Sequence, residues 1–243
     1  MDDLQGELHR IADASPEAEG PLSRSADVLG EDAMARLAAL RVAVFGVGGV
    51  GSVCAEALVR TGVRNITIVD DDVVAPSNLN RQIQSSRDTI GMPKVEALRA
   101  RLASIAPDAG IVAIRARYSG ASPDARVPAL ATFDVVVDAI DSVADKAALL
   151  REAVGAGVRV YSSMGAALRR DPTRVRVSRF EKVAGDGLAR ALRQRFKKDG
   201  GPPIAGFLCV HSDEPPLDLP RRGSVMPVTA TFGLTLASLV IGR

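Results

Sequence analysis

The chain has 243 residues, of which 47% are apolar and 25% charged, and its glycine and proline usage is ordinary; this excludes pervasive disorder, collagen and coiled coil. Its two cysteines, Cys54 and Cys209, can form neither a disulfide framework nor an all-cysteine zinc site. A protein that depends on its apolar core, in a reducing cytoplasm, is therefore expected. The net charge of +2 gives no global argument for a nucleic-acid partner.

The amino-terminal half begins with a polar stretch and continues with a βαβ pattern. Residues 1–21 lack a basic and apolar leader and are expected to form a mobile tail. Residues 40–45 are nearly all apolar and rich in valine, as in a strand buried on both faces. Residues 52–61 have helical composition, and residues 65–69 form a second β-branched run. Together they predict a βαβ unit of about 30 residues.

The later segments continue the same alternation. Strands are expected at 111–114, 133–140, 158–162 and 173–178, and helices at 93–105, 145–154 and around 188–198. This order predicts an α/β fold with a doubly wound, mainly parallel Rossmann-like sheet and a C-terminal extension. No linker or repeat divides the chain, so residues 22–243 are expected to form a single domain in which 169–243 are basic and rich in loops. The apolar run 228–241 falls short of the ~20 residues of a membrane span.

A glycine-rich turn follows the first predicted strand. Its glycines are Gly46, Gly48, Gly49 and Gly51. A GxGxxG turn between a strand and a helix presents backbone N–H groups to phosphates. Asp70 ends the second strand, where a carboxylate can accept hydrogen bonds from a ribose hydroxyl. These features fit a dinucleotide or a nucleoside triphosphate equally well.

The next motifs favour ATP over NAD. Arg81 in the run SNLNRQ and Lys94 in the run GMPK bring two cations toward the same crevice. A triphosphate carries more charge than the pyrophosphate diester of NAD, which backbone groups alone can hold, so cations there favour ATP. Asp141, at the end of the predicted strand 133–140, is expected at the same edge of the sheet and can hold Mg²⁺.

In order and spacing, these motifs resemble the ubiquitin-activating-enzyme-like adenylating superfamily that includes ThiF and MoeB. The resemblance implies that ATP and Mg²⁺ are bound by the glycine turn, by the acidic run that contains Asp70 and Asp72, and by Asn78, Arg81, Lys94 and Asp141. Of these residues, Arg81, Lys94 and Asp141 are the candidate catalytic residues, with Asp141 the metal ligand. Arg24 is similar to an arginine that the family donates across a dimer interface, which implies a homodimer.

The second half resembles one family within this superfamily, the tRNA threonylcarbamoyladenosine dehydratases. The resemblance rests on the runs VDAIDS with Lys146, DPTRVRV, LCVHS and VTATFG, together with a basic helix. It implies ATP-dependent dehydration, by cyclisation, of N6-threonylcarbamoyladenosine in tRNA through a carboxyl adenylate. A cysteine desulfurase system is a further partner that this family suggests.

The distribution of charge supports a polyanionic partner. Residues 169–198 contain 11 basic and 3 acidic residues, a charge of +8, which leaves −6 on the rest of the chain. Such a segment is either a solvated face or a surface for a phosphate backbone. The first interpretation is the commoner one for a basic segment alone, and the resemblance favours the second.

Three alternatives stay open. A ThiF-like or MoeB-like enzyme would adenylate the C-terminus of a small sulfur-carrier protein with the same ATP residues, although this chain lacks the CxxC pairs of that group. A nucleotide-binding module without turnover would keep the crevice alone. Cys209 and His211 share one side of a predicted strand and can be read as a nucleophile and its base, or as buried packing residues.

Overall fold

The computed structural model describes residues 20–120, 124–200 and 204–242. The strands are β1 (Arg41–Phe45), β2 (Asn65–Val69), β3 (Gly110–Ile114), β4 (Val135–Asp138), β5 (Arg159–Ser163), β6 (Val175–Arg179) and β7 (Leu208–Ser212). The α-helices are α2 (Ser23–Leu29), α3 (Glu31–Ala39), α4 (Gly51–Arg60), α5 (Lys94–Ile105), α6 (Val143–Gly155), α7 (Gly187–Asp199) and α8 (Met226–Ile241). Short 3₁₀ helices lie at Pro76–Asn78, Arg87–Thr89, Leu130–Thr132, Pro172–Arg174 and Phe180–Lys182.

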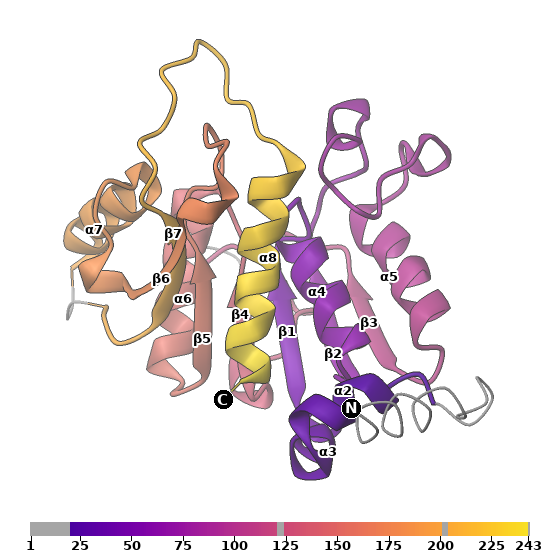
Figure 1. Ribbon diagram of the computed structural model, residues 1–243. Helices are drawn as coiled ribbons and strands as arrows, with labels where there is room; N and C mark the ends of the chain where they lie inside the picture. The colour runs from indigo at the N-terminus through magenta and orange to yellow at the C-terminus, as the bar shows by residue number, and fades with distance from the viewer. Residues whose placement is uncertain (1–19, 121–123, 201–203, 243) are drawn as a thin grey trace, which may run out of the picture.

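The strands form one seven-stranded sheet in the order β3-β2-β1-β4-β5-β7-β6 (Figure 1). Each neighbouring pair is parallel except β6 and β7, which are antiparallel. The order runs outward from β1 in both directions, so the sheet is doubly wound and the predicted fold class is confirmed. The carboxyl ends of β1, β4 and β5 consequently meet at one edge, above which Figure 1 shows the loops that follow β2 and β7.

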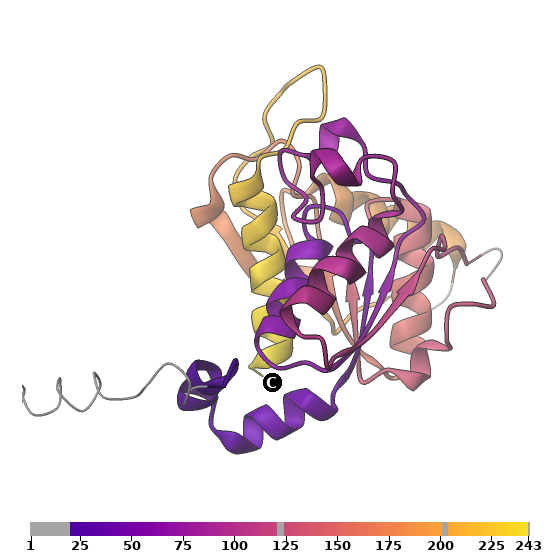
Figure 2. The ribbon, with the colours of Figure 1, turned by 90° about the vertical axis from the view of Figure 1, so that its right-hand side faces the viewer.

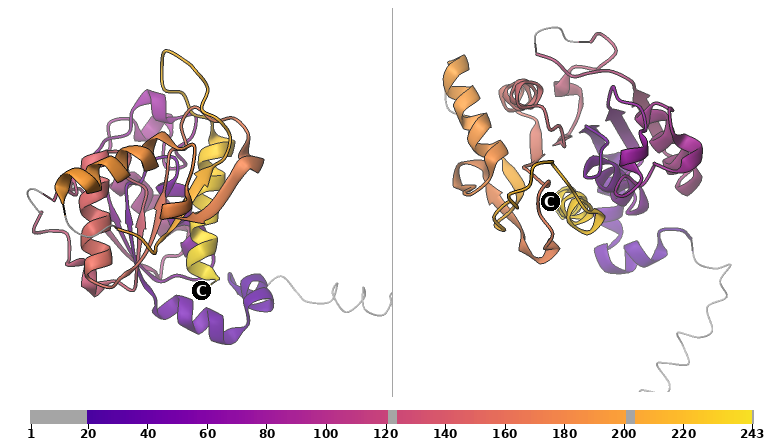
Figure 3. Two further views of the ribbon diagram at one scale, coloured as in Figure 1. Left: turned by 90° about the vertical axis from the view of Figure 1, so that its left-hand side faces the viewer. Right: turned by 90° about the horizontal axis from the view of Figure 1, so that it is seen from above.

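The core has one layer on each face of the sheet (Figure 3). Alternate residues of β1 point to opposite layers, Val42 and Val44 toward α4, α5 and α8, and Ala43 and Phe45 toward α6 and α7. All four are almost completely buried. This explains the continuous apolar run in the sequence, because a strand covered on both faces has no solvent side to mark with polar residues.

Strand β4 is shorter than predicted. The apolar run suggested a strand over 133–140 that ended at Asp141, but β4 ends at Asp138. The Asp138 carboxylate accepts a hydrogen bond from the backbone N–H of Ile140, at 3.1 Å, which turns the chain away from the ladder. Asp141 therefore lies in the loop after the strand.

The carboxyl-terminal elements follow the predicted order. The alternating stretch gives β6, an edge strand whose Val177 is 40% exposed, and the basic helix is α7. The final apolar run is α8, which packs against α4. Among the described residues, no helix combines the length and apolar character needed to cross a membrane.

Helices α2 and α3 lie at the amino end of the sheet, away from the loops at its carboxyl edge (Figures 1 and 2). The expected tail covers residues 1–21, and residues 1–19 of it lie outside the described part of the chain.

Candidate nucleotide-binding site

The glycine turn lies between β1 and α4, and two of its glycines are required by packing. Gly46 has a φ of +84°, and a Cβ there would lie 2.7 Å from the carbonyl oxygen of Ala139. A Cβ on Gly51 would lie 1.8 Å from the carbonyl oxygen of Gly46. A side chain at either position would force the strand and helix apart, so these two glycines set the shape of the turn.

Gly48 has a different environment. A Cβ there would meet nothing closer than the Gln82 side-chain nitrogen, at 3.9 Å, so the space over this residue is open. Gly49 faces Thr229 of α8 and the aliphatic part of Arg81, 3.1 and 3.2 Å from a built Cβ. Among the residues that the structure describes, no side chain caps the amino end of α4. An open glycine at an uncapped helix start fits a phosphate group.

Asp70 holds the glycine turn in place. One carboxylate oxygen accepts a hydrogen bond from the N–H of Val47 at 2.8 Å, and the other accepts one from the N–H of Asp72 at 2.9 Å. Burial raises the pKa of this carboxyl above its ordinary value, while the nearby charge of Lys94 opposes the rise. Asp70 thus joins the end of β2 to the turn, in addition to any contact with a ribose.

Lys94 and Asp72 form an ion pair beside Asp70. The distance between Lys94 Nζ and the Asp72 carboxylate is 2.7 Å, and the Lys94 N–H also donates to the Asp72 carbonyl oxygen at 3.0 Å. The Lys94 side chain is 8% exposed and that of Asp72 66%. The sequence predicted both residues at the site, and the structure places Asp72 where it orients the lysine.

The loop that carries Asn78 and Arg81 is ordered by its own side chains. Asn78 is buried and its side-chain oxygen accepts from the N–H of Ala75 at 2.9 Å. Arg81 Nη1 donates to the Ser77 carbonyl and to the Asn80 side chain, both at 2.8 Å. Within the described chain, no hydrogen bond engages Arg81 Nε or Nη2, so the other edge of the guanidinium is available to an anion.

Two glutamines that sequence reasoning did not select complete the floor of the site. Gln84 is buried and donates to the Val47 carbonyl oxygen at 2.6 Å. Gln82 is also buried, and its side-chain nitrogen is the atom nearest to the open face of Gly48. The run NRQIQ gave only a weak signal, since Ile83 is the one apolar residue beside the two glutamines.

Carboxylates surround the same edge. The ligand atoms of Asp70, Asp71 and Asp72 lie within 4.8 Å of one another. Asp71 and Asp141 both lie near Arg117, whose pKa is raised first by its hydrogen bond to Asp145 and further by these two charges. The donor set is therefore carboxylate oxygen, which suits Mg²⁺. Asp71 was not among the predicted site residues.

Behind Asp141 lies a buried ionic cluster. Lys146 Nζ is 2.7 Å from the Asp138 carboxylate and donates to the Ile140 carbonyl oxygen at 3.0 Å, and both charged side chains are fully buried. The Ser162 hydroxyl donates to Asp138 at 2.6 Å. This cluster joins the ends of β4 and β5 to the first turn of α6, and so fixes the loop that carries Asp141.

Arg24 is the predicted site residue that the structure does not bring to this edge. It lies on α2, at the amino end of the sheet, whereas the glycine turn lies at the carboxyl end (Figure 2). Arg24 therefore does not reach the glycine turn of its own chain in this structure.

The pair Cys209 and His211 does not form a nucleophilic site. Cys209 is fully buried, and burial raises the pKa of its thiol, which disfavours the thiolate. His211 Nε2 is 3.0 Å from the Ser178 hydroxyl oxygen, and burial lowers the pKa of the imidazole. Cys54 is buried in α4, with its pKa also raised by burial. The two cysteines are packing residues.

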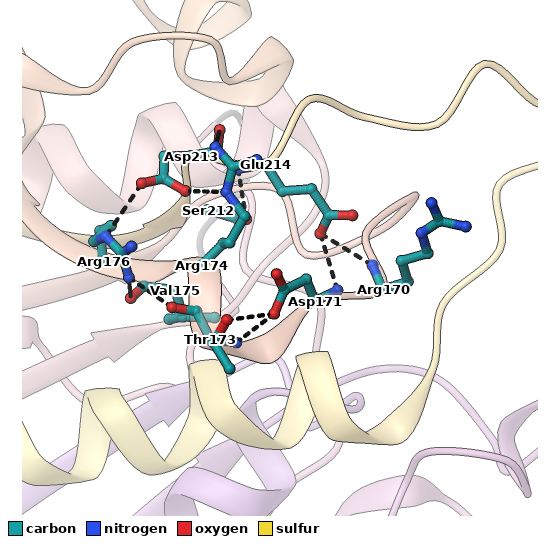
Figure 4. Close-up of polar contacts among 9 residues, drawn as sticks. All are labelled: Arg170, Asp171, Thr173, Arg174, Val175, Arg176, Ser212, Asp213 and Glu214. Carbon is teal, nitrogen blue, oxygen red and sulfur yellow. Dashed lines mark hydrogen bonds and ion pairs between the residues drawn. The ribbon is translucent and has the colours of Figure 1, made fainter.

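The basic segment 169–198 is only partly free for a partner. Arg169 is 4% exposed, Arg193 donates to the carbonyls of Phe180 and Val183, and Arg195 pairs with Asp199. Arg174 and Arg176 both pair with Asp213 (Figure 4). The remaining cations of the segment, whose side chains have no hydrogen-bond or ion-pair partner among the described residues, are Arg170, Arg179, Lys182, Arg190, Lys197 and Lys198.

A doubly wound sheet with an open glycine turn at its carboxyl edge, flanked by Arg81 and Lys94, defines a nucleotide-binding α/β protein. The model of the ThiF family matches residues 22–242. The chain therefore belongs to the ThiF family.

Several similar proteins are tRNA threonylcarbamoyladenosine dehydratases. The tRNA threonylcarbamoyladenosine dehydratase of Bacillus subtilis (strain 168) is 33% identical over 234 residues, which make up 90% of this chain and 91% of that protein. The crystal structure of E. coli tRNA N6-threonylcarbamoyladenosine dehydratase, TcdA, in complex with ATP matches with a TM-score of 0.84 and 33% identity, over 94% of this chain and 95% of that one. The complex of the same protein with AMP matches with a TM-score of 0.84 and 32% identity, over the same shares of the two chains.

Proposed function

We propose that this protein catalyses the ATP-dependent dehydration of N6-threonylcarbamoyladenosine in tRNA, by cyclisation through a carboxyl adenylate. The observation that carries the proposal is the open glycine turn with Arg81 and Lys94 beside it, in a chain that aligns over 94% of its length with an ATP-bound dehydratase. Residues 22–243 act as a single adenylating domain, of which 169–243 form the extension that faces the RNA.

The first step needs positioning and charge neutralisation. The threonyl carboxylate of the modified nucleoside attacks the α-phosphorus of ATP, an oxygen–phosphorus bond forms, and pyrophosphate leaves. The N–H groups of the glycine turn and the free edge of Arg81 are suited to hold the phosphates, and Lys94, oriented by Asp72, supplies a second cation. Asn78 orders the loop that carries Arg81.

The second step needs no nucleophile from the protein. The carbamoyl group of the same modification attacks the activated carbonyl, a ring closes, and AMP leaves with the former carboxylate oxygen, while a proton is released. The nucleoside has then lost one water in total. The burial of both cysteines is consistent with a reaction in which no thiol takes part.

Mg²⁺ would be held by Asp141, at the edge that also carries Asp70, Asp71 and Asp72. When bound, it would neutralise phosphate charge. Asp70 contributes to nucleotide binding by holding the glycine turn, and Asp72 contributes by orienting Lys94.

A homodimer would let Arg24 of one protomer act at the other protomer's phosphates, because within a chain this residue lies at the opposite end of the sheet. The reaction takes place in the cytoplasm, on tRNA. A cysteine desulfurase system is a further proposed partner, although neither buried thiol offers an exposed acceptor for its sulfur.

The proposal is tested by incubating the purified protein with ATP, Mg²⁺ and tRNA that bears the modification, followed by mild digestion and mass spectrometry of the nucleosides. We expect an ATP-dependent loss of one water from threonylcarbamoyladenosine, with AMP and pyrophosphate formed. Pyrophosphate exchange with a small ubiquitin-like protein, and no change in the tRNA, would instead support the sulfur-carrier reaction.

The glycine turn gives a matched pair of variants. We expect Gly48→Ala to leave the free energy of unfolding within ~0.5 kcal/mol of wild type and to weaken ATP binding by roughly tenfold, because its methyl group enters the open space over the turn. Gly46→Ala should instead cost ~2–3 kcal/mol of stability, because of its positive φ and the contact with Ala139. Urea unfolding measures the stability of each variant, and isothermal titration calorimetry measures its affinity for ATP. An equal loss of stability in the two variants would contradict the conclusion that packing requires Gly46 and leaves Gly48 open to a phosphate.

A further inference from the structure

The chain between β7 and α8, residues 213–225, projects beyond the carboxyl edge of the sheet. In Figures 1 and 2 it is the yellow loop that rises above the strand ends, on the side of the molecule that holds the glycine turn. Its exposed large apolar residues are Leu219, at 52%, and Val225, at 43%. The sequence predicted a long loop over 212–223 but assigned it no role.

Backbone hydrogen bonds hold the base of this loop together. The N–H of Leu168 donates to the Gly223 carbonyl oxygen, and the N–H of Leu217 donates to the Leu168 carbonyl oxygen, both at 2.8 Å. The first and last residues of the segment 217–223 are thus both hydrogen-bonded to one residue of the β5–β6 connection, Leu168. We name this segment the clasped loop. Leu168 has a φ of 61°, the one positive value among the described residues other than glycine. Strained backbone of this kind is concentrated at functional sites.

A second tether connects the clasped loop to the nucleotide site. The Asn80 side-chain nitrogen donates to the Ser224 carbonyl oxygen at 2.9 Å, and the Asn80 side-chain oxygen accepts from Arg81. One side chain therefore orients Arg81 and also fixes the residue that follows the clasped loop. The position of the loop is set relative to the place where the phosphates of ATP are proposed to bind.

The clasped loop carries cations that the fold does not use. Arg221 and Arg222 are exposed, and in the described part of the chain no hydrogen bond or ion pair holds either guanidinium. Arg170, two residues after Leu168, binds Glu214 through its backbone N–H alone, and its side chain points away from Glu214 and Asp171 (Figure 4). Arg174 and Arg176, by contrast, are both held in ion pairs with Asp213.

We infer that the clasped loop is the element that places the tRNA: Arg221 and Arg222 bind phosphates that flank the modified nucleotide, and Arg170 extends this contact at the base of the loop. The inference rests on the proposed function and names where its substrate is held. Arginine suits phosphate through paired N–H donors, and a single-stranded nucleotide also offers a base face that Leu219 can contact. The clasp at Leu168 orders the two arginines in advance, which reduces the entropy lost on binding.

The test compares two double variants that each remove two neighbouring positive charges. Arg221→Ala/Arg222→Ala alters the clasped loop, and Lys197→Ala/Lys198→Ala alters the exposed last turn of α7. Cyclisation is measured with modified tRNA at several concentrations and salt levels, and ATP binding is measured separately by calorimetry. Arg221→Lys/Arg222→Lys keeps the charge and tests whether any loss arises from altered folding of the loop.

We expect the clasped-loop variant to raise KM for tRNA by about tenfold or more, with ATP binding unchanged. The slope of log(1/KM) for tRNA against the logarithm of the salt concentration should become shallower by about 1.4 to 1.8, because two phosphate contacts are lost. The α7 variant should change KM less than about threefold, and the lysine variant should recover most of the loss. Equal effects in the two alanine variants, or an unchanged KM in the clasped-loop variant, would overturn the inference. Wild-type protein that binds ATP but leaves the tRNA unchanged would instead overturn the proposed function.

Discussion

Lys146→Met is expected to lower the free energy of unfolding by about 3–5 kcal/mol, because it leaves the Asp138 carboxylate buried without a cation. The free energy of unfolding of an ordinary domain is about 5–15 kcal/mol, so this variant would be close to unfolding. Urea unfolding followed by far-ultraviolet circular dichroism measures the change, since the chain has no tryptophan. Lys198→Met, on the exposed last turn of α7, is the control and should stay within ~0.5 kcal/mol of wild type.

The double variant Asp138→Asn/Lys146→Met distinguishes a buried charge from a loss of packing. With the carboxylate replaced by a neutral amide, no unpaired charge remains in the core, so the double variant should be more stable than Lys146→Met alone. The double-mutant cycle then gives a coupling between the two positions. Strictly additive effects would mean that Lys146 contributes packing and not charge compensation.

This cluster also shows where the sequence stops being informative. Apolar runs predicted β1 and β2 almost to the residue, because a strand buried on both faces has a continuous signature that local composition displays. Asp138 lies inside such a run and looked like part of a strand that continues to Asp141. Its partner Lys146 lies on α6 and Ser162 lies on β5, and nothing in a single sequence states that these three meet.

Those residues of the candidate site that belong to a local sequence motif could be predicted. The glycine turn, Arg81 and Lys94 come from local patterns, and the rule that parallel strands end at one edge placed them together. The division of roles among the glycines was not visible, because it depends on Ala139, which is distant in sequence. A count of basic residues likewise could not show that Arg174 pairs with Asp213, 39 residues later.

Arg81→Ala is expected to lower kcat/KM for dehydration by ~10²–10³, equivalent to ~2.7–4 kcal/mol of transition-state stabilisation. The physical reason is the preorganised guanidinium: Nη1 is held by Ser77 and Asn80, which leaves the other edge fixed in place for the charge that develops on the phosphates. Steady-state rates of AMP release, with ATP and modified tRNA each varied, measure the loss. Stability should change little, because Arg81 lies in a loop and is incompletely buried.

Arg87→Ala is the matched control for this prediction. Arg87 lies six residues further along the same connection, is exposed, and has no hydrogen bond or ion pair in the described residues. Both variants remove one positive charge from one loop, so a general electrostatic effect would lower the two rates alike. A loss confined to Arg81→Ala assigns the effect to contact with the phosphates, whereas retention of more than a tenth of the activity would mean that Lys94 and the glycine turn suffice.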